Sequence, residues 1–328
     1  MKKVYLFMVL AAIICGCQCK PKTPVKGKWA IALHGGAGNL DPKNFTNEDI
    51  KRYEEGLKEA LHIGKLALAE GKSSMDVVEM VVRQLEDNPL FNAGKGSVFT
   101  HDGRNELDAA IMDGRDLNAG AVAGVGDIKN PISAARLVME KSPHVLMVGK
   151  GASQYAAERG IEMVDSSYFY TEKRWMTLQR ALQKAGKNGT VGCVALDKEG
   201  NLAAATSTGG MNNKRYGRVG DVPVIGAGTY ANNNTCAVSA TGHGEYYIRY
   251  TVAHDISALM EYKGLSLDDA AREVINGKLS NKHGNGGVIS VDKYGNVVLE
   301  MNATGMFRGW SNSEGLDGVA IFKDHEAL

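Results

Sequence analysis

The same strand, turn and strand pattern occurs twice in this chain. Gly192 begins the segment GCVALDKEGNLAAAT, and Gly287 begins the segment GVISVDKYGNVVLEM. In each segment two apolar runs flank the turn D-K-x-G-N, where Gly200 or Gly295 can take the positive φ of a tight hairpin. Because a hairpin pairs its two strands antiparallel, the repeat restricts the chain to a fold that contains antiparallel sheets.

Amphipathic helices are predicted around these hairpins. Apolar side chains recur three or four residues apart before Gly71, and again after Ser74, which we interpret as an N-cap. Asn130-Pro131 has the form of a cap followed by a first helical residue, and Ser266 is a further predicted N-cap. The predicted helices cover residues 47–70, 74–88, 131 onward, 244–262 and 266–275.

Shorter apolar runs predict the other strands. Residues 29–33 should form a buried strand that stops at the glycine-rich loop 34–38, where backbone must approach some other group closely. Residues 107–112 and 119–126 read as strands joined by Asp113-Gly114. The order of strands, then paired helices, then strands again indicates an α+β fold. We expect an αββα sandwich of antiparallel sheets, which forms one domain over residues 28–328.

The charge balance excludes some classes of partner. The 38 basic and 37 acidic residues give a net charge of +1, which becomes −1 without Lys2 and Lys3. Neither value favours nucleic acid or an anionic membrane surface. A chain of 328 residues with 44% hydrophobic content can bury a full core.

The first 17 residues predict an export signal. Lys2 and Lys3 precede an apolar run that is too short to span a bilayer, and Ile14-Cys15-Gly16-Cys17 resembles a bacterial lipobox. Cys17 would then be the lipidated first residue of an exported periplasmic or cell-envelope lipoprotein, held to the membrane only by this anchor. Residues 18–27 would be a tether. The alternatives for the leader are a plain secretory signal and a strand of the inner core.

The remaining cysteines and one polar segment complete the organisation. Cys193 and Cys236 lie in apolar surroundings and are predicted to be free thiols, and no metal-ligand spacing occurs. The weakly patterned segment of about residues 170–189 is the best linker in the chain.

Thr190 is the candidate nucleophile, because Gly189-Thr190 stands directly before an apolar strand and suggests a scissile bond. After cleavage, Thr190 would supply its hydroxyl as nucleophile and its own α-amine as base. A free α-amine has a pKa of about 7.7–8.0 and can accept a proton near neutral pH. An ordinary turn before a strand is the alternative.

Other residues downstream have matching chemistry. Thr208 ends the strand paired with that of Thr190, and Thr241-Gly242 offers the hydroxyl and backbone N–H that an oxyanion needs. Arg218 and Asp221 form a complementary pair that could bind an α-carboxylate and an α-ammonium. A surface salt bridge between these two is the alternative.

Six motifs resemble the plant-type asparaginase and isoaspartyl peptidase family of N-terminal nucleophile hydrolases. They appear in family order from Trp29 to the C-terminus: HGGAG, FNAGKG, TSTGG, GRVGD, GAGTYANN and TGHGE. The resemblance implies a four-layer αββα sandwich and self-cleavage between Gly189 and Thr190. It also implies an α chain that ends at 189, a β chain of residues 190–328, and a dimer of αβ units.

The resemblance also implies roles for individual residues. Thr208 would orient the nucleophile, and Asn92 would buttress it, while His243 would lie behind the site. No catalytic cofactor is implied, and a structural sodium ion would be held by main-chain carbonyls. The implied oxyanion and substrate residues are Thr241, Gly242, Arg218, Asp221 and Gly244, and the implied sodium positions are Leu85, Glu86, Asn88, Phe91, Ala93 and Lys95.

The expected activity is hydrolysis of β-aspartyl dipeptides and L-asparagine with release of aspartate. Glycosylasparaginases of this family carry aspartate before their threonine, whereas this chain carries Gly189. That activity and a non-catalytic lipoprotein that binds amino acids or peptides are the alternatives. A serine hydrolase is excluded because G-x-S-x-G is missing, and the dinucleotide-like Gly226-Ala227-Gly228 lacks a full fingerprint.

Overall fold

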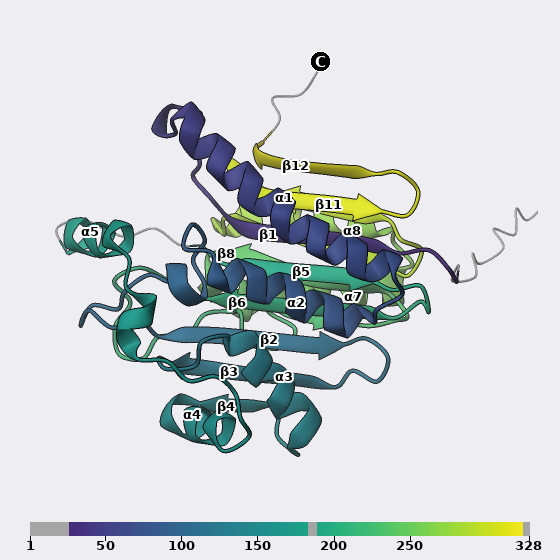
Figure 1. The fold of residues 1–328 in the computed structure, drawn as a ribbon. Helices are drawn as coiled ribbons and strands as arrows, with labels where there is room; N and C mark the ends of the chain where they lie inside the picture. The colour runs from purple at the N-terminus through teal and green to yellow at the C-terminus, as the bar shows by residue number, and fades with distance from the viewer. Residues whose placement is uncertain (1–25, 183–188, 324–328) are drawn as a thin grey trace, which may run out of the picture.

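The computed structural model describes residues 26–182 and 189–323 as a mixed α+β structure with two sheets and flanking helices (Figure 1). The predicted signal, Cys17 and most of the predicted tether lie outside the described residues. The helices are α1 (Asn47–Ala69), α2 (Ser74–Asp87), α3 (Pro131–Lys141), α4 (Gly149–Ala157), α5 (Glu172–Ala181), α6 (Gly244–Tyr250), α7 (Val252–Lys263) and α8 (Leu267–Arg272).

The larger sheet has eight strands in the order β12-β11-β1-β5-β6-β2-β3-β4. All neighbours pair antiparallel except β3 and β4, which are parallel because α3 carries the chain back across the sheet between them. The prediction of purely antiparallel sheets is therefore wrong at this edge. The strands are β1 (Ala30–Gly38), β2 (Leu107–Asp113), β3 (Ala119–Val125), β4 (Leu146–Val148), β5 (Val191–Leu196), β6 (Leu202–Thr208), β11 (Gly305–Asn312) and β12 (Asp317–Phe322).

The smaller sheet is antiparallel and has four strands in the order β10-β9-β8-β7. Both predicted hairpins are present, as β5–β6 and β9–β10, and their turn residues Gly200 and Gly295 have φ of 87° and 85°. The strands are β7 (Thr229–Ala231), β8 (Cys236–Gly242), β9 (Gly286–Asp292) and β10 (Val297–Met301).

The two faces of the larger sheet pack into separate cores. Side chains on one face, such as Ile31 and Leu33, pack with α1, α2 and α3. Their neighbours Ala30 and Ala32 point to the other face, which packs against the smaller sheet and, beyond it, α7 and α8. The strict alternation places both faces of β1 in a core, and the small alanines let the two sheets approach closely.

Several predicted boundaries need correction. Strand β1 does not stop at His34 but continues to Gly38, with an irregularity between His34 and Gly36 that keeps the glycines within the ladder. The N-cap of α2 is Ser73, whose hydroxyl accepts the Asp76 amide at 3.2 Å, rather than Ser74. The predicted helix 244–262 divides at Thr251, where φ is 47°.

The predicted linker contains a helix. Residues Glu172–Ala181 form α5, which begins after the N-cap Thr171. Its packing residue Leu178 is buried, so tertiary contacts stabilise a segment whose own apolar pattern is weak. Cys193 and Cys236 are buried and free, as predicted.

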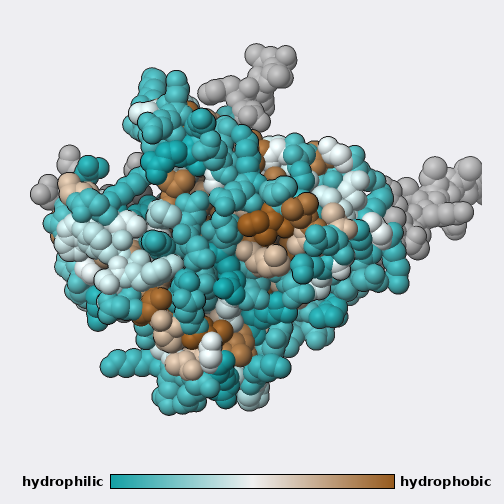
Figure 2. Space-filling model, in the orientation of Figure 1, coloured by the Kyte–Doolittle hydropathy of each residue, from teal (hydrophilic) through white to brown (hydrophobic). Residues whose placement is uncertain are grey.

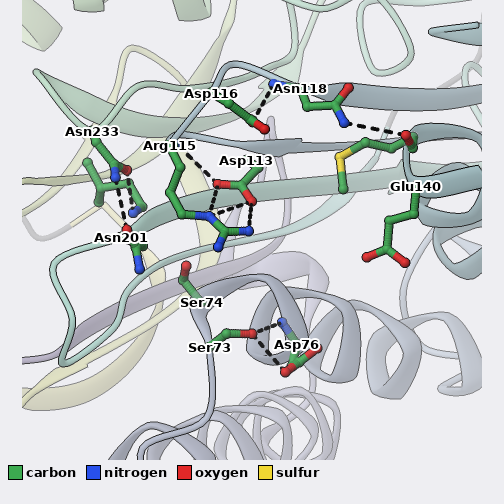
Figure 3. Close-up of polar contacts among 12 residues, drawn as sticks. Ser73, Ser74, Asp76, Asp113, Arg115, Asp116, Asn118, Glu140, Asn201 and Asn233 are labelled. Carbon is green, nitrogen blue, oxygen red and sulfur yellow. Dashed lines mark hydrogen bonds and ion pairs between the residues drawn. The ribbon is translucent and has the colours of Figure 1, made fainter. Parts of the chain in front are cut away.

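At the end of the sheets remote from Thr190, polar groups join the two layers (Figure 3). The Asn233 side chain accepts the Leu202 amide at 2.8 Å and donates to Asn201 at 3.1 Å, while the Asn233 amide donates to the Gly114 carbonyl at 2.8 Å. Because Asn233 precedes β8, these bonds tie the smaller sheet to the β5–β6 hairpin. They satisfy backbone groups that the turns would otherwise bury without partners.

The surface carries two apolar areas on the face shown in Figure 2, one over the α1–α2 seam and one near β4 and α4. Exposed side chains in these elements include Leu66, Met80, Leu146 and Val148. Within residues 26–182 and 189–323, no helix is long and apolar enough to cross a membrane.

Glu86 is a fully buried acid that links α2 to β6. Its Oε1 accepts the Ser207 hydroxyl at 2.7 Å and the Ile132 amide at 3.1 Å, while Oε2 has no hydrogen-bond partner. Burial raises the pKa of Glu86 to about 8, because the charged form loses its hydration.

The variant Glu86→Gln should flatten the dependence of stability on pH. The folded-state pKa lies above the ordinary value, so the protonated acid favours folding at low pH, and that stability is lost as the pH rises through about 8. Gln cannot ionise, so the midpoint temperature of thermal unfolding should change less in the variant than in the wild type between about pH 5 and 9. In the control Glu55→Gln, which removes an exposed acid, stability should depend on pH as it does in the wild type. If Glu86→Gln also kept the wild-type dependence, the raised pKa of Glu86 would be contradicted.

Candidate active site

The carbonyl of Gly189 is held by two hydrogen-bond donors. Asn92 Nδ2 lies 2.6 Å and Thr208 Oγ1 lies 2.9 Å from this oxygen. Thr190 Oγ1 in turn donates to Thr208 Oγ1 at 3.3 Å, and Thr190 is buried. The hydroxyl of Thr190 therefore stands beside a carbonyl that is already polarised from two directions.

The register of the central strands brings these groups together. Thr190 directly precedes β5, and Thr208 is the last residue of the neighbouring β6, where Val191 pairs with Ser207. Asn92 is fixed by its own amide, since its Oδ1 accepts from Val98 N at 2.8 Å and its Nδ2 also donates to Gly210 O at 2.8 Å. Each side chain is thus oriented before any substrate arrives.

The glycine-rich part of β1 is packed against Thr190, and its composition had predicted a close backbone approach without identifying the partner. A Cβ on Gly36, which has φ of 112°, would lie 3.2 Å from the Thr190 nitrogen. A Cβ on Gly192 would overlap Ser239 and His34, whose Oγ and Nε2 hydrogen-bond at 2.9 Å. Glycine at both positions lets backbone and polar side chains meet around the nucleophile.

His34 is a buried residue that sequence reasoning did not assign to the site. Burial lowers the pKa of its imidazole to about 3, so the ring is neutral at physiological pH. Beyond Ser239, the hydrogen bonds continue to Thr206 at 2.7 Å and from there to Thr229 at 2.7 Å. This chain of hydroxyl groups crosses the space between the two sheets beside the nucleophile. The only sign of it in the sequence is the alternation of side chains along β6 and β8, which places these hydroxyls on the facing sides of the two sheets.

Thr241 and Gly242, the predicted oxyanion residues, end strand β8, and Gly242 lines the same cleft as Thr190. Thr241 Oγ1 accepts the Ala37 amide at 3.1 Å, which leaves its single hydroxyl proton available for donation. Gly242 has φ of 155°, and a Cβ there would overlap the Asn285 carbonyl. This small cleft is lined by Gly189, Thr190, Thr208, Gly210, Met211, Arg218, Gly220, Asp221 and Gly242.

Arg218 and Asp221 both face this cleft, with Gly244 between them. A Cβ on Gly244 would lie 2.7 Å from Asp221 Oδ1 and 2.9 Å from Arg218 Nη2, so only glycine leaves room for both groups. The described contacts include no salt bridge between Arg218 and Asp221, so that alternative is wrong. Arg218 instead pairs with Glu245 on α6, through Nε at 2.9 Å and Nη2 at 3.0 Å.

Glu245 belongs to the TGHGE motif, but its sequence position alone gave it no role. Its carboxylate occupies the fork of Arg218 much as a bound carboxylate would. The pair lowers the pKa of Glu245 by hydrogen bonding and charge attraction, against an opposing effect of burial. A ligand carboxylate must therefore share or displace this partner.

Asp221 is the unpaired charge of the site. It is buried, its Oδ2 has no hydrogen-bond partner, and burial raises its pKa to about 7 despite the nearby Arg218. An ammonium group placed in the cleft would supply the missing partner. Burial without a partner is otherwise costly, which makes this carboxyl a candidate binding group.

His243 lies outside the residues that line the cleft. Its side chain is exposed, and its backbone amide donates to the Asn285 carbonyl at 2.9 Å at the start of α6. Its ring lies 6.2 Å from that of Tyr246.

The predicted sodium positions gather where the end of α2 meets the Asn92 loop. Gly94 and Gly96 must be glycine, since a Cβ on either would overlap the carbonyl of Glu86 or Phe91. The carbonyl oxygens of this loop are ligands suited to a hard cation, so the donor chemistry fits. Across the described part of the chain, no cluster of three or more His, Cys, Asp or Glu could hold a metal.

Comparison with known proteins agrees with this geometry. A family model described as asparaginase matches residues 27–321. The chain belongs to the asparaginase family. It is 49% identical to an isoaspartyl peptidase of Escherichia coli, over 91% of this chain and 97% of that protein. It is also 42% identical to an isoaspartyl peptidase/L-asparaginase of Homo sapiens, over 84% of this chain and 91% of that protein.

Replacing Glu245 with Gln should strengthen binding of L-aspartate, because the competing carboxylate in the Arg218 fork loses its charge. Exposed or half-exposed ion pairs contribute at most about 1 kcal/mol, so a two- to fivefold lower Kd in calorimetric titration is expected. The control Glu314→Gln removes a carboxylate from the Lys28 ion pair at the far end of β1 and should leave the Kd unchanged. Weaker binding in Glu245→Gln would show that Glu245 instead orients Arg218.

Binding of L-aspartate should also weaken as the pH falls through about 7. Below that value the Asp221 carboxyl is protonated in the free site, so it offers no charge to the ligand ammonium. Titrations between about pH 5 and 8 should show this loss, whereas Asp221→Asn should bind weakly with little dependence on pH in that range. A wild-type Kd that is constant over this range would contradict the role of Asp221.

Proposed function

We propose that this protein is a self-activating isoaspartyl peptidase and L-asparaginase. The two-donor contact on the Gly189 carbonyl, beside the Thr190 hydroxyl, carries the proposal. Membership of the asparaginase family and the names of its relatives support the substrate class.

Self-cleavage begins with attack of Thr190 Oγ1 on the Gly189 carbonyl carbon. Asn92 and Thr208 donate to the oxygen on which negative charge develops. The C–N bond to Thr190 then breaks, the Thr190 nitrogen takes up the hydroxyl proton, and Gly189 is left as an ester on Thr190 Oγ1. Water hydrolyses that ester, which frees the Gly189 carboxylate and restores the hydroxyl beside a new α-amine.

The matured site repeats the same chemistry on substrate. Arg218 binds the α-carboxylate and Asp221 the α-ammonium, so the β-carbonyl of the aspartyl group is presented to Thr190. The α-amine of Thr190 accepts the hydroxyl proton, and Thr241 with the Gly242 amide stabilises the oxyanion. The departing amine takes the proton, leaving as ammonia or an amino acid, and water hydrolyses the β-aspartyl ester to aspartate.

The remaining sequence predictions fit this assignment. We propose that the two sheets and flanking helices are the four-layer αββα sandwich of N-terminal nucleophile hydrolases, in one domain over residues 28–328, and that αβ units pair as dimers. A sodium ion bound by the carbonyls of residues 85–95 would stabilise the Asn92 loop, without part in the reaction. Export as a lipoprotein through Cys17 is supported only by the leader sequence.

Thr190→Ala should remain a single inactive chain, because it lacks the hydroxyl for both reactions. The wild type should yield two chains, one beginning Thr190-Val191-Gly192, in intact-mass and N-terminal sequencing measurements. Thr190→Ser retains a hydroxyl and should still be cut, which controls for any general effect of substitution at this position. Hydrolysis of an isoaspartyl dipeptide by Thr190→Ala would contradict the nucleophile, and a wild type that stays uncut and inactive would favour the binding-protein alternative.

A further inference from the structure

Helix α5 contacts the loop that carries Asn92. The Arg174 guanidinium donates to Gly96 O at 2.6 Å and to Leu90 O at 3.2 Å, so a single side chain holds both ends of the segment containing Asn92. Hydrogen bonds from a charged donor are stronger than neutral ones, and the planar guanidinium fixes the direction of each bond.

A second contact reaches the far side of the same loop. Trp175 packs edge to face on Phe99, with ring centroids 5.3 Å apart. Phe99 follows Val98, whose amide donates to Asn92 Oδ1 at 2.8 Å. Arg174 and Trp175 therefore stabilise the segments before and after Asn92, which donates to the Gly189 carbonyl.

The other end of α5 contacts the segment that leads to Arg218. Asn212 Nδ2 donates to Thr177 O at 3.4 Å, and Asn213 Nδ2 donates to Ala181 O at 3.2 Å. Ala181 O belongs to the last turn of α5, where the helix itself leaves acceptors without partners, whereas Thr177 O lies one turn earlier. Asn213 has φ of 66°, a conformation that asparagine adopts more readily than most residues.

The contacts at Asn212 and Asn213 cross the proposed cleavage point. Helix α5 lies before Gly189 and would belong to the α chain, whereas Asn212 and Asn213 lie after Thr190 and would belong to the β chain. They do not depend on the Gly189–Thr190 bond, so they can persist after it is cut. A passive linker would need none of these side-chain contacts.

We propose that α5 is a positioning element of the active site and that Arg174 is its principal positioning residue. The helix holds the Asn92 loop in place for self-cleavage, and it orders the 211–218 segment for substrate binding in the matured enzyme. This inference rests on the proposed function, because it assigns α5 a role in the two reactions of Thr190.

The test compares Arg174→Met with Arg180→Met. Met fills similar space without donors, and Arg180 is an exposed arginine of the same helix with no side-chain hydrogen bond or ion pair among the described residues. Because small misplacements of reacting groups can cost up to about 100-fold in rate, Arg174→Met should slow self-cleavage about tenfold. Arg180→Met should be cut at the wild-type rate, and Arg174→Lys, which keeps one charged donor, should recover part of the loss.

Asn213→Asp provides a second variant, which keeps the size of the side chain but replaces the donor that faces Ala181 O with an acceptor. After maturation it should show a KM for L-asparagine about threefold or more higher with little change in kcat, as expected for a contact that affects ground-state binding. Thermal unfolding of each variant identifies any loss that arises only from global instability.

Two results would overturn the role of α5: equal cleavage rates in folded Arg174→Met and Arg180→Met, or losses that vanish when rates are measured well below each unfolding midpoint. If Arg174→Met fails to fold, the KM of Asn213→Asp decides the question, and an unchanged KM counts against the proposal. Failure of the proposed function is distinguishable, because the wild type itself would then remain uncut and inactive.

Discussion

The position of β5 between β1 and β6 is the constraint on which the site depends. Antiparallel pairing sets His34 opposite Gly192 and Val191 opposite Ser207, so the residues just before β5 meet the end of β6 and the glycines of β1. A shift of one residue would reverse which face each side chain occupies. The two cores prevent such a shift, because they require Cys193 and Val194 on opposite faces. Packing of the whole molecule thus fixes the contact between Thr190 and Thr208.

Two kinds of polar group surround this contact. The donors on the Gly189 carbonyl are already satisfied, and they need no reorganisation when charge develops there. The Asp221 carboxyl is the opposite case, since it is buried without a full set of partners and would gain one from a ligand ammonium. Between them, Arg218 is occupied by Glu245. The site therefore combines preorganised donors on the Gly189 carbonyl with a region whose charges would have to rearrange to accept a ligand carboxylate and ammonium.

In the proposed function, self-processing and turnover would use overlapping parts of the same scaffold. Asn92 and Thr208 hold the Gly189 carbonyl, whereas the proposed function gives Thr241 and Gly242 the carbonyl of a substrate. Helix α5 connects the loops that serve each reaction, through Arg174 on one side and Asn213 on the other. A segment that is polar and weakly patterned in sequence is in this way part of the machinery.

The sequence by itself determined the hairpins and most helix positions, and it predicted chemical roles for the motif residues. D-K-x-G-N turns and three-to-four periodicity are local signals, and a glycine-threonine junction with arginine and aspartate downstream needs only residue chemistry to be interpreted. Tertiary structure alone decided that Arg218 pairs with Glu245, that His34 is neutral in the interior, that β4 runs parallel to β3, and that α5 is a docked helix. These features depend on contacts between groups far apart in the chain. They also depend on burial, which shifts the pKa of charged groups and stabilises a weak helix only once the layers have packed.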